Sequence, residues 1–122
     1  MSTVLVSDFD HYVKLIEGEK RLIIVDFSAT WCAPCKKFLP ILDQLSTQYP
    51  DQLLILKVDA DQDRQLEEEK RMFPLFTVQS LPTIVFVKNS TFQKGDEFRI
   101  QGFNLPKFKK ALQTLGNFSS MP

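Results

Sequence analysis

The stretch Ala29-Thr30-Trp31-Cys32-Ala33-Pro34-Cys35-Lys36-Lys37 holds both cysteines of the chain. It follows the apolar run 22–27 (LIIVDF) and precedes apolar residues at helical spacing, namely Phe38, Ile41, Leu42 and Leu45. Pro34 suits the first turn of a helix, where a missing N–H costs nothing. The sequence therefore predicts two thiols at the junction of a buried strand and a helix. Such a pair indicates either dithiol–disulfide chemistry or metal binding.

The composition limits the classes of function. In 122 residues, 15 Lys and Arg balance 15 Asp and Glu, whereas nucleic-acid or anionic membrane surfaces usually carry excess positive charge. We therefore expect no nucleic-acid or membrane partner. The first residues do not resemble a secretory signal, and no apolar run approaches the roughly 18 residues that span a bilayer. With two cysteines and no framework of disulfides, we expect a reducing compartment, the cytoplasm. We also expect a monomer.

Apolar patterns along the chain predict alternating strands and helices. Strands are expected over 3–6, 22–27, 53–59, 84–87 and, as the returning strand of a hairpin, 96–101. Helices are expected from an N-cap at Ser7 to Gly18, from Cys32 or Ala33 to about Tyr49, over the charged residues 61–70, and over 105–115. This order predicts one three-layer α/β/α domain over 1–122, with a mixed, roughly five-stranded sheet and four helices. Its core spans about 3–116, and residues 117–122 form a frayed tail.

Two charged residues interrupt the predicted central strands. Asp26 is either a solvated aspartate at the strand end or a buried acid whose pKa is raised near the thiols. Lys57 either neutralises Asp26 across the sheet or reaches outward, and we favour neutralisation because charges in central strands need partners. The single histidine, His11, lies off the apolar stripe of its helix, so we expect a solvated side chain.

Several residues together carry a resemblance to a known family. The segment 25–36 (VDFSATWCAPCK) resembles the active-site segment of thioredoxins, and W-C-x-P-C after an apolar strand is highly specific. Pro40 falls where the family bends the same helix, the segment 81–83 (LPT) resembles its cis-proline loop, and Gly102 resembles the glycine beside that loop. The resemblance covers roughly residues 4–115. Two departures are Ala33, where glycine is commonest, and several extra residues between Asp59 and Pro82.

The resemblance implies the thioredoxin fold and a protein disulfide reductase that helps to maintain cellular redox balance. It implies that Cys32 attacks a target disulfide and that Cys35 resolves the mixed disulfide, which leaves a Cys32–Cys35 disulfide. It also agrees with Asp26 as the acceptor of the Cys35 proton. Expected supporting residues are Trp31, Ala33, Pro34, Lys57 and Pro82, and expected target contacts are Trp31, Leu81, Pro82 and Gly102.

The resemblance also implies partners outside the chain. No cofactor is expected to bind, and electrons are expected from NADPH through a donor similar to thioredoxin reductase. Expected targets are disulfide-containing proteins such as peroxiredoxins.

Three other interpretations fit less well. A zinc site wants four ligands, but the chain offers two cysteines and one distant histidine. Secretory oxidants and isomerases of this fold tend to carry histidine where this chain has Pro34. A non-enzymatic interaction module would draw on the long segment 61–76, yet it would need neither cysteine.

Overall fold

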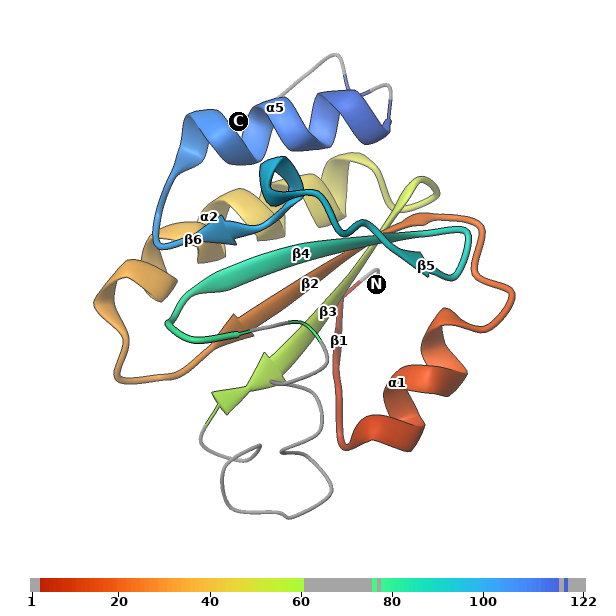
Figure 1. Ribbon diagram of the computed structural model, residues 1–122, viewed down its shortest axis with the longest axis horizontal. Helices are drawn as coiled ribbons and strands as arrows, with labels where there is room; N and C mark the ends of the chain where they lie inside the picture. Colours follow the sequence, from red (N-terminus) through yellow and green to blue (C-terminus); the bar gives the residue numbers. More distant parts are fainter. Residues whose placement is uncertain (1–2, 61–75, 77, 117, 119–122) are drawn as a thin grey trace.

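A mixed β-sheet forms the middle layer of the protein (Figure 1). The computed structural model describes residues 3–60, 76, 78–116 and 118. The strands run in the order β1-β3-β2-β4-β5, and β6 pairs with β4 beyond this path. Strands β1, β3 and β2 are parallel, whereas β4 is antiparallel to β2. Their bounds are β1 Thr3–Leu5, β2 Leu22–Ser28, β3 Leu53–Asp59, β4 Thr83–Lys88, β5 Thr91–Phe92 and β6 Ile100–Gln101.

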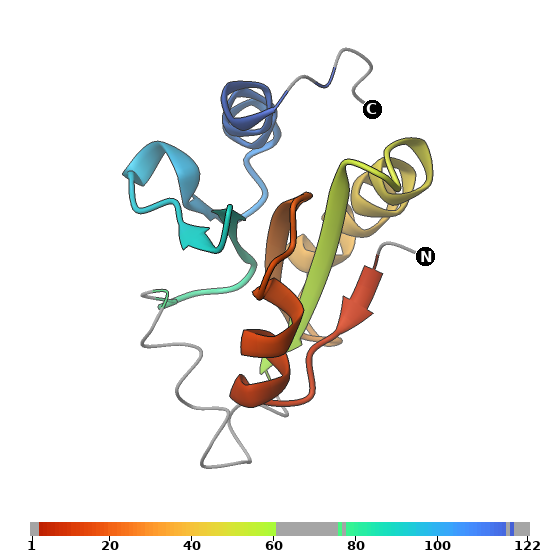
Figure 2. The same ribbon diagram turned by 90° about the vertical axis from the view of Figure 1, so that its right-hand side faces the viewer.

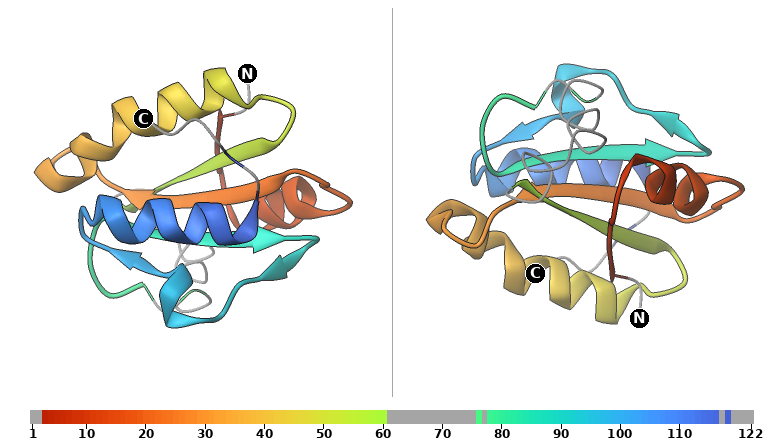
Figure 3. Two further views of the ribbon diagram at one scale, coloured as in Figure 1. Left: turned by 90° about the horizontal axis from the view of Figure 1, so that it is seen from above. Right: turned by 90° about the horizontal axis from the view of Figure 1, so that it is seen from below.

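Helices cover both faces of this sheet, as Figures 1 and 2 show. They are α1 (Phe9–Ile16), α2 (Ala33–Gln48) and α5 (Leu105–Leu115). Successive strand residues point to opposite faces, so β2 contributes to two cores. Leu22 and Ile24 pack with α2 and α5, whereas Ile23, Val25 and Phe27 pack with Tyr12 of α1 and with Phe76. The predicted three-layer architecture is confirmed, and Figure 3 shows its two outer layers from above and below.

The ends of α1 differ from the sequence prediction in one respect. Its N-cap is Asp8 rather than Ser7, because the Asp8 carboxylate accepts a hydrogen bond of 2.8 Å from the backbone N–H of His11. The expectation of a freely solvated His11 is wrong, because its side chain is half-buried and its Nδ1 accepts a 2.9 Å hydrogen bond from the backbone N–H of Ser7. Gly18, with φ +70°, follows the C-terminus of α1 as expected.

The predicted strand over 96–101 is wrong in its first part. Asn89 and Ser90, with φ of 52° and 61°, form the tight turn from β4 to the short strand β5. Residues Asp96–Phe98 then form a 3-10 helix, η2, with both of its acids in the first turn, where the helix dipole favours negative charge. Of the predicted strand, the last two residues form β6, which pairs with the start of β4.

Two other predictions meet the limits of the described residues. The fourth predicted helix, over 61–70, lies outside them, and the described residues contain three α-helices. The frayed tail falls largely outside as well. At Phe118, however, the chain packs onto the core. Its side chain is 5% exposed, and its ring meets Tyr49 edge-on at a centroid distance of 5.1 Å.

Candidate active site

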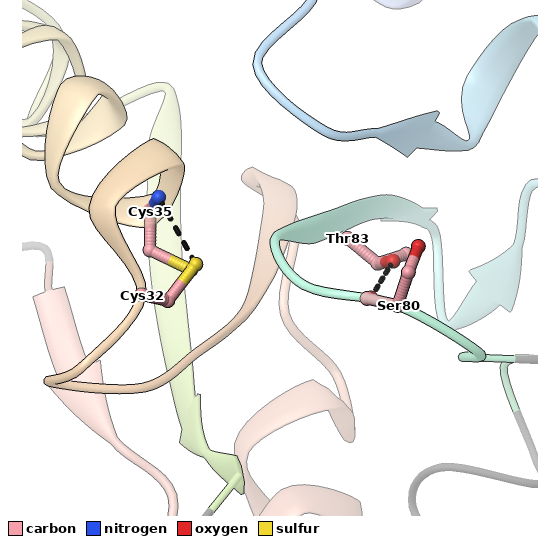
Figure 4. Close-up of a disulfide and its surroundings, with 4 residues drawn as sticks. All are labelled: Cys32, Cys35, Ser80 and Thr83. Carbon is pink, nitrogen blue, oxygen red and sulfur yellow. Dashed lines mark hydrogen bonds between the residues drawn. A yellow bond between two sulfur atoms is a disulfide. The ribbon is translucent and has the colours of Figure 1, made fainter.

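The two cysteines form a disulfide at the start of α2 (Figure 4). Cys32 is the N-cap, and Cys35 lies in the first turn with its Cα 5.3 Å from that of Cys32. Pro34 occupies this first turn, where its missing N–H removes no helical hydrogen bond. The backbone N–H of Cys35 donates a hydrogen bond of 3.3 Å to Sγ of Cys32. This donor and the helix dipole stabilise negative charge on the Cys32 sulfur, which is the charge of the reactive thiolate.

Asp26 is the buried acid that the sequence left as one of two alternatives. Its side chain lies on the same face of β2 as Leu22 and Ile24, which is the face that α2 covers. Asp26 is the last of these three residues along β2, toward the end of the strand that leads to α2. Asp26 is 1% exposed, and neither carboxylate oxygen has a hydrogen-bond partner among the residues that the structure describes. Desolvation by burial raises its pKa to about 7 from 3.8. The acid therefore exchanges its proton near neutral pH.

Lys57 lies beside Asp26 on the neighbouring strand, because the two residues are register partners of β3 and β2. Within the described residues, no hydrogen bond or ion pair joins the two side chains. The positive charge of Lys57 lowers the pKa of Asp26, but desolvation has the larger effect. Lys57 also lines a cavity of about 280 Å³ whose wall includes Cys35. Lys57 thus offsets part of the cost of an ionised Asp26 without forming a direct salt bridge.

A loop before β4 lies opposite the cysteines, as Figure 4 shows. The peptide bond between Leu81 and Pro82 is cis, as the resemblance implied. The hydroxyl of Thr83 donates a 2.6 Å hydrogen bond to the carbonyl of Ser80 and holds the loop. Leu81 packs against the small buried cluster of Ala29, Cys32, Cys35 and Ala60. The loop therefore forms one wall of the site.

Gly102 joins this wall from a third segment, after β6. Its backbone N–H donates a 2.8 Å hydrogen bond to the carbonyl of Pro82, and its φ of +75° favours glycine. Trp31, Ala33 and Pro34 are all exposed beside the cysteines, Trp31 with 60% of its surface. The structure thus brings the predicted residues of β2, α2, β4 and the Gly102 loop to one end of the molecule.

The sequence did not predict a contact between Phe103 and Lys37 beside this site. Phe103 follows Gly102, is 37% exposed, and sets its ring edge-on to Phe38 of α2 at 4.7 Å between centroids. Nζ of Lys37 lies 5.9 Å from the centroid of the same ring. The available signal was an aromatic residue directly after a glycine that was already expected to contact targets.

In the part of the chain that the structure describes, no helix is both long and apolar enough to cross a membrane. The same part contains no group of three or more His, Cys, Asp or Glu side chains that could hold a metal ion.

Comparisons with known proteins agree with this geometry. The family model described as Thioredoxin matches residues 2–113. Thioredoxin-T of Drosophila melanogaster is 40% identical over 75 residues, which are 62% of this chain and 44% of that protein. The crystal structure of Fasciola hepatica thioredoxin superimposes with a TM-score of 0.75 at 28% identity and covers 92% of this chain and 98% of that one.

A further solved chain comes from work on thiol resolution in a yeast mitochondrial 1-Cys peroxiredoxin via glutathione and thioredoxin systems. It matches with a TM-score of 0.74 at 27% identity, over 93% of this chain and 96% of that chain. Together with the Cys32–Cys35 disulfide at the start of α2, these matches disfavour a non-enzymatic module. The chain belongs to the thioredoxin family, and it is a thiol–disulfide oxidoreductase of the protein disulfide reductase type.

Proposed function

We propose that this protein reduces disulfides of other proteins with Cys32 as the nucleophile, Cys35 as the resolving thiol and Asp26 as the proton acceptor. The observation that carries the proposal is the hydrogen bond from the N–H of Cys35 to Sγ of Cys32 at the start of α2. A donor at this position favours the thiolate of Cys32, and the thiolate is the form that attacks a disulfide.

In the first step, the Cys32 thiolate attacks one sulfur of the target disulfide. A bond forms between Cys32 and that sulfur, the target disulfide breaks, and the other target sulfur leaves as a thiolate that takes a proton from water. Trp31, Pro34 and the backbone of Leu81 surround the attack site. We propose that an extended target segment pairs with the main chain of Leu81, as peptides do in strand addition. Gly102 holds the neighbouring carbonyl of Pro82 in place.

In the second step, Cys35 attacks Sγ of Cys32 and breaks the mixed disulfide. The target leaves as a dithiol, and the protein keeps the Cys32–Cys35 disulfide. Cys35 must first lose its proton. We propose that the ionised carboxylate of Asp26 accepts it directly or through water, with Lys57 stabilising the ionised state. A pKa of about 7 suits this exchange, because the carboxyl group can both take up and release a proton at neutral pH.

Regeneration of the dithiol needs two electrons and two protons per cycle. Members of this family work with reductases and disulfide targets, and we propose NADPH as the electron source, acting through a separate reductase of the thioredoxin-reductase kind. We propose peroxiredoxins as one target class, supported by the peroxiredoxin work among the structural neighbours. We propose the cytoplasm as the compartment, because the thiol reductants of the cytoplasm return a disulfide such as Cys32–Cys35 to its reduced form.

A trapping experiment tests the assignment of the two cysteines. The Cys35→Ser variant, reduced and then mixed with a disulfide-bonded peptide, should accumulate a stable mixed disulfide through Cys32, seen as an added peptide mass. The matched Cys32→Ser variant should accumulate little, because Cys32 is the N-cap whose sulfur accepts the hydrogen bond from the N–H of Cys35, whereas Cys35 lies within the first turn of α2. Equal trapping by both variants, or trapping through Cys35 alone, would contradict the assignment.

A further inference from the structure

Phe103 extends the site away from the cysteines. It lies in the loop between β6 and α5, at the same end of the molecule as the start of α2 (Figures 1 and 3). The backbone N–H of the neighbouring Gly102 donates a hydrogen bond to the carbonyl of Pro82, so this loop is fixed against the wall of the site. The Phe103 ring rests edge-on against Phe38, which is fully buried, yet 37% of Phe103 stays exposed. It is therefore a large apolar surface in a fixed position beside the attack site.

The loop that carries Phe103 is held from both ends. Asn104, the next residue, accepts a hydrogen bond of 3.2 Å from the backbone of Lys107 and caps α5. Its own N–H donates a 3.1 Å hydrogen bond to the carbonyl of Gly102. A side chain placed by such a loop presents its surface with little loss of conformational entropy on binding.

Lys37 adds an unpaired positive charge to this surface. Its ammonium group lies 5.9 Å from the centroid of the Phe103 ring, within the range of a cation–π interaction. No carboxylate pairs with it among the described residues. The acid Asp96 of η2 lies 3.7 Å from Lys107 of α5. The ring therefore holds an ammonium group whose remaining donors are available to a partner.

We propose that Lys37 and Phe103 form a recognition site for an acidic side chain next to the reactive cysteine of the target. The target carboxylate pairs with Lys37, and the apolar part of the target segment lies on the ring of Phe103. The inference rests on the proposed disulfide reductase function and adds a preference among its targets. Both residues act by positioning the target, and neither touches the reacting sulfurs.

Matched peptides test this preference. Each peptide carries one intermolecular disulfide, and the residues that flank its cysteine are both Glu, both Gln or both Lys. With dithiothreitol as the reductant, no reductase enters the measurement, and kcat/KM reports target recognition alone. For the unmodified protein, we expect kcat/KM to be about two- to fivefold higher for Glu than for Gln, and lowest for Lys, as for an exposed ion pair. The preference should shrink at high salt.

Variants then locate the preference. The Lys37→Ala variant should have the same kcat/KM for the Glu and Gln peptides. The Lys37→Glu variant should have its highest kcat/KM for the Lys peptide. Phe103→Ala should raise KM for the Glu peptide with kcat unchanged, whereas Phe103→Tyr should keep the preference because its ring can still hold the ammonium group. The matched control is Lys110→Ala, which removes an exposed lysine charge from α5.

The outcomes separate this inference from the function on which it rests. A preference for Glu that survives in Lys37→Ala, or that disappears equally in Lys110→Ala, would overturn the recognition site. Equal kcat/KM for all three peptides in the unmodified protein would also overturn it and leave the reductase function intact. An unmodified protein that reduces none of the peptides would overturn both.

Discussion

Asp26 is costly for folding in its ionised form, yet its burial gives it a pKa that suits proton transfer. A carboxyl group that is 1% exposed and lacks a hydrogen-bond partner is costly to ionise, which is why its pKa rises to about 7. The same desolvation makes the ionised group a stronger proton acceptor than a solvated aspartate. A merely structural residue at this buried position would more often be apolar, like Ile24 beside it.

The first prediction concerns the stability of Asp26→Asn. Between about pH 4 and pH 7, folded protein retains the Asp26 proton that the unfolded chain has released, because the folded pKa of about 7 lies above the ordinary 3.8. The unfolded state then binds fewer protons, so the free energy of unfolding falls as pH rises through this window and levels off above it. The total fall is at most on the order of 4 kcal/mol, from about three pKa units.

Asn cannot ionise, so this contribution to the pH dependence should vanish in Asp26→Asn. Urea denaturation from pH 4 to pH 8 measures it, and the variant should be more stable than the unmodified protein at pH 8. An unchanged pH dependence would mean that Asp26 does not titrate near neutrality. Asp51→Asn is a suitable control because Asp51 is exposed at the end of α2.

The second prediction concerns turnover by the same variant. Loss of the carboxylate removes the proposed proton acceptor of Cys35, so resolution of the mixed disulfide should slow. In the unmodified protein, the resolution rate should fall below about pH 7 as Asp26 takes up a proton. Single-turnover kinetics of a disulfide peptide measure this step. A variant with an unchanged rate and pH profile would make the proton-transfer role untenable.

Among the elements, α2 and α5 both position residues of the site. Helix α2 supplies the cysteines and the buried face of Phe38, and α5 anchors the Gly102 loop through its N-cap, Asn104. Phe108 of α5 packs edge-on against Phe38, with 5.4 Å between ring centroids. The two helices therefore fix the distance between the thiols and the loop that carries Phe103.

The third prediction tests the cap of α5. Asn104→Ala removes the acceptor for the N–H of Lys107 and should lower the free energy of unfolding by about 1 kcal/mol. It should also raise KM for disulfide peptides, because the loop beside Phe103 loses one of its two restraints. The control is Gln113→Ala, an exposed position of the same helix, which should change stability by less than about 0.5 kcal/mol. Equal effects of both substitutions would show that the cap does not support the site.

At the scale of the whole molecule, Phe118 near the end of the sequence packs into the core between the sheet and its helices. This residue packs beside Tyr49, the C-cap of α2, within the core that α2 and α5 share with the sheet. Phe118 therefore covers the core at the C-terminal end of α2, which is the end away from the cysteines. It is a source of stability that is separate from the chemistry.

The fourth prediction follows from this separation. Phe118→Ala should lower the free energy of unfolding by about 3 kcal/mol, as expected when a buried aromatic ring is removed. Urea denaturation measures the change, and turnover per folded molecule should stay the same. Phe103→Ala is the matched control, because it removes the same side chain from a half-exposed position and should cost much less. A loss of less than about 1 kcal/mol in Phe118→Ala would mean that Phe118 contributes little to core packing.

Some of this architecture was predictable because local patterns decide it. The apolar runs of β2 and β3 require burial on both faces, and Pro34 and the cysteine spacing place the start of α2. The strand over 96–101 was mispredicted because short segments near Gly95 satisfy a 3-10 turn as readily as a strand, and only pairing with β4 separates the two.

The site was predictable to the extent that the family motif covers it. Pattern alone left the state of Asp26 open, because alternation along a strand does not say which helix covers a residue. The contact between Phe103 and Lys37 joins two segments distant in the sequence, and no periodicity records it. Such long-range juxtapositions arise only when the sheet and its covering helices are assembled.

The most direct test of the central claim is reduction of insulin disulfides by dithiothreitol, with the unmodified protein compared with Cys32→Ser. The claim is that Cys32, the N-cap of α2, is the nucleophile of a disulfide reductase. The unmodified protein should accelerate insulin reduction well above the dithiothreitol background, and Cys32→Ser should fall to that background while remaining folded. Full activity of Cys32→Ser would contradict the account.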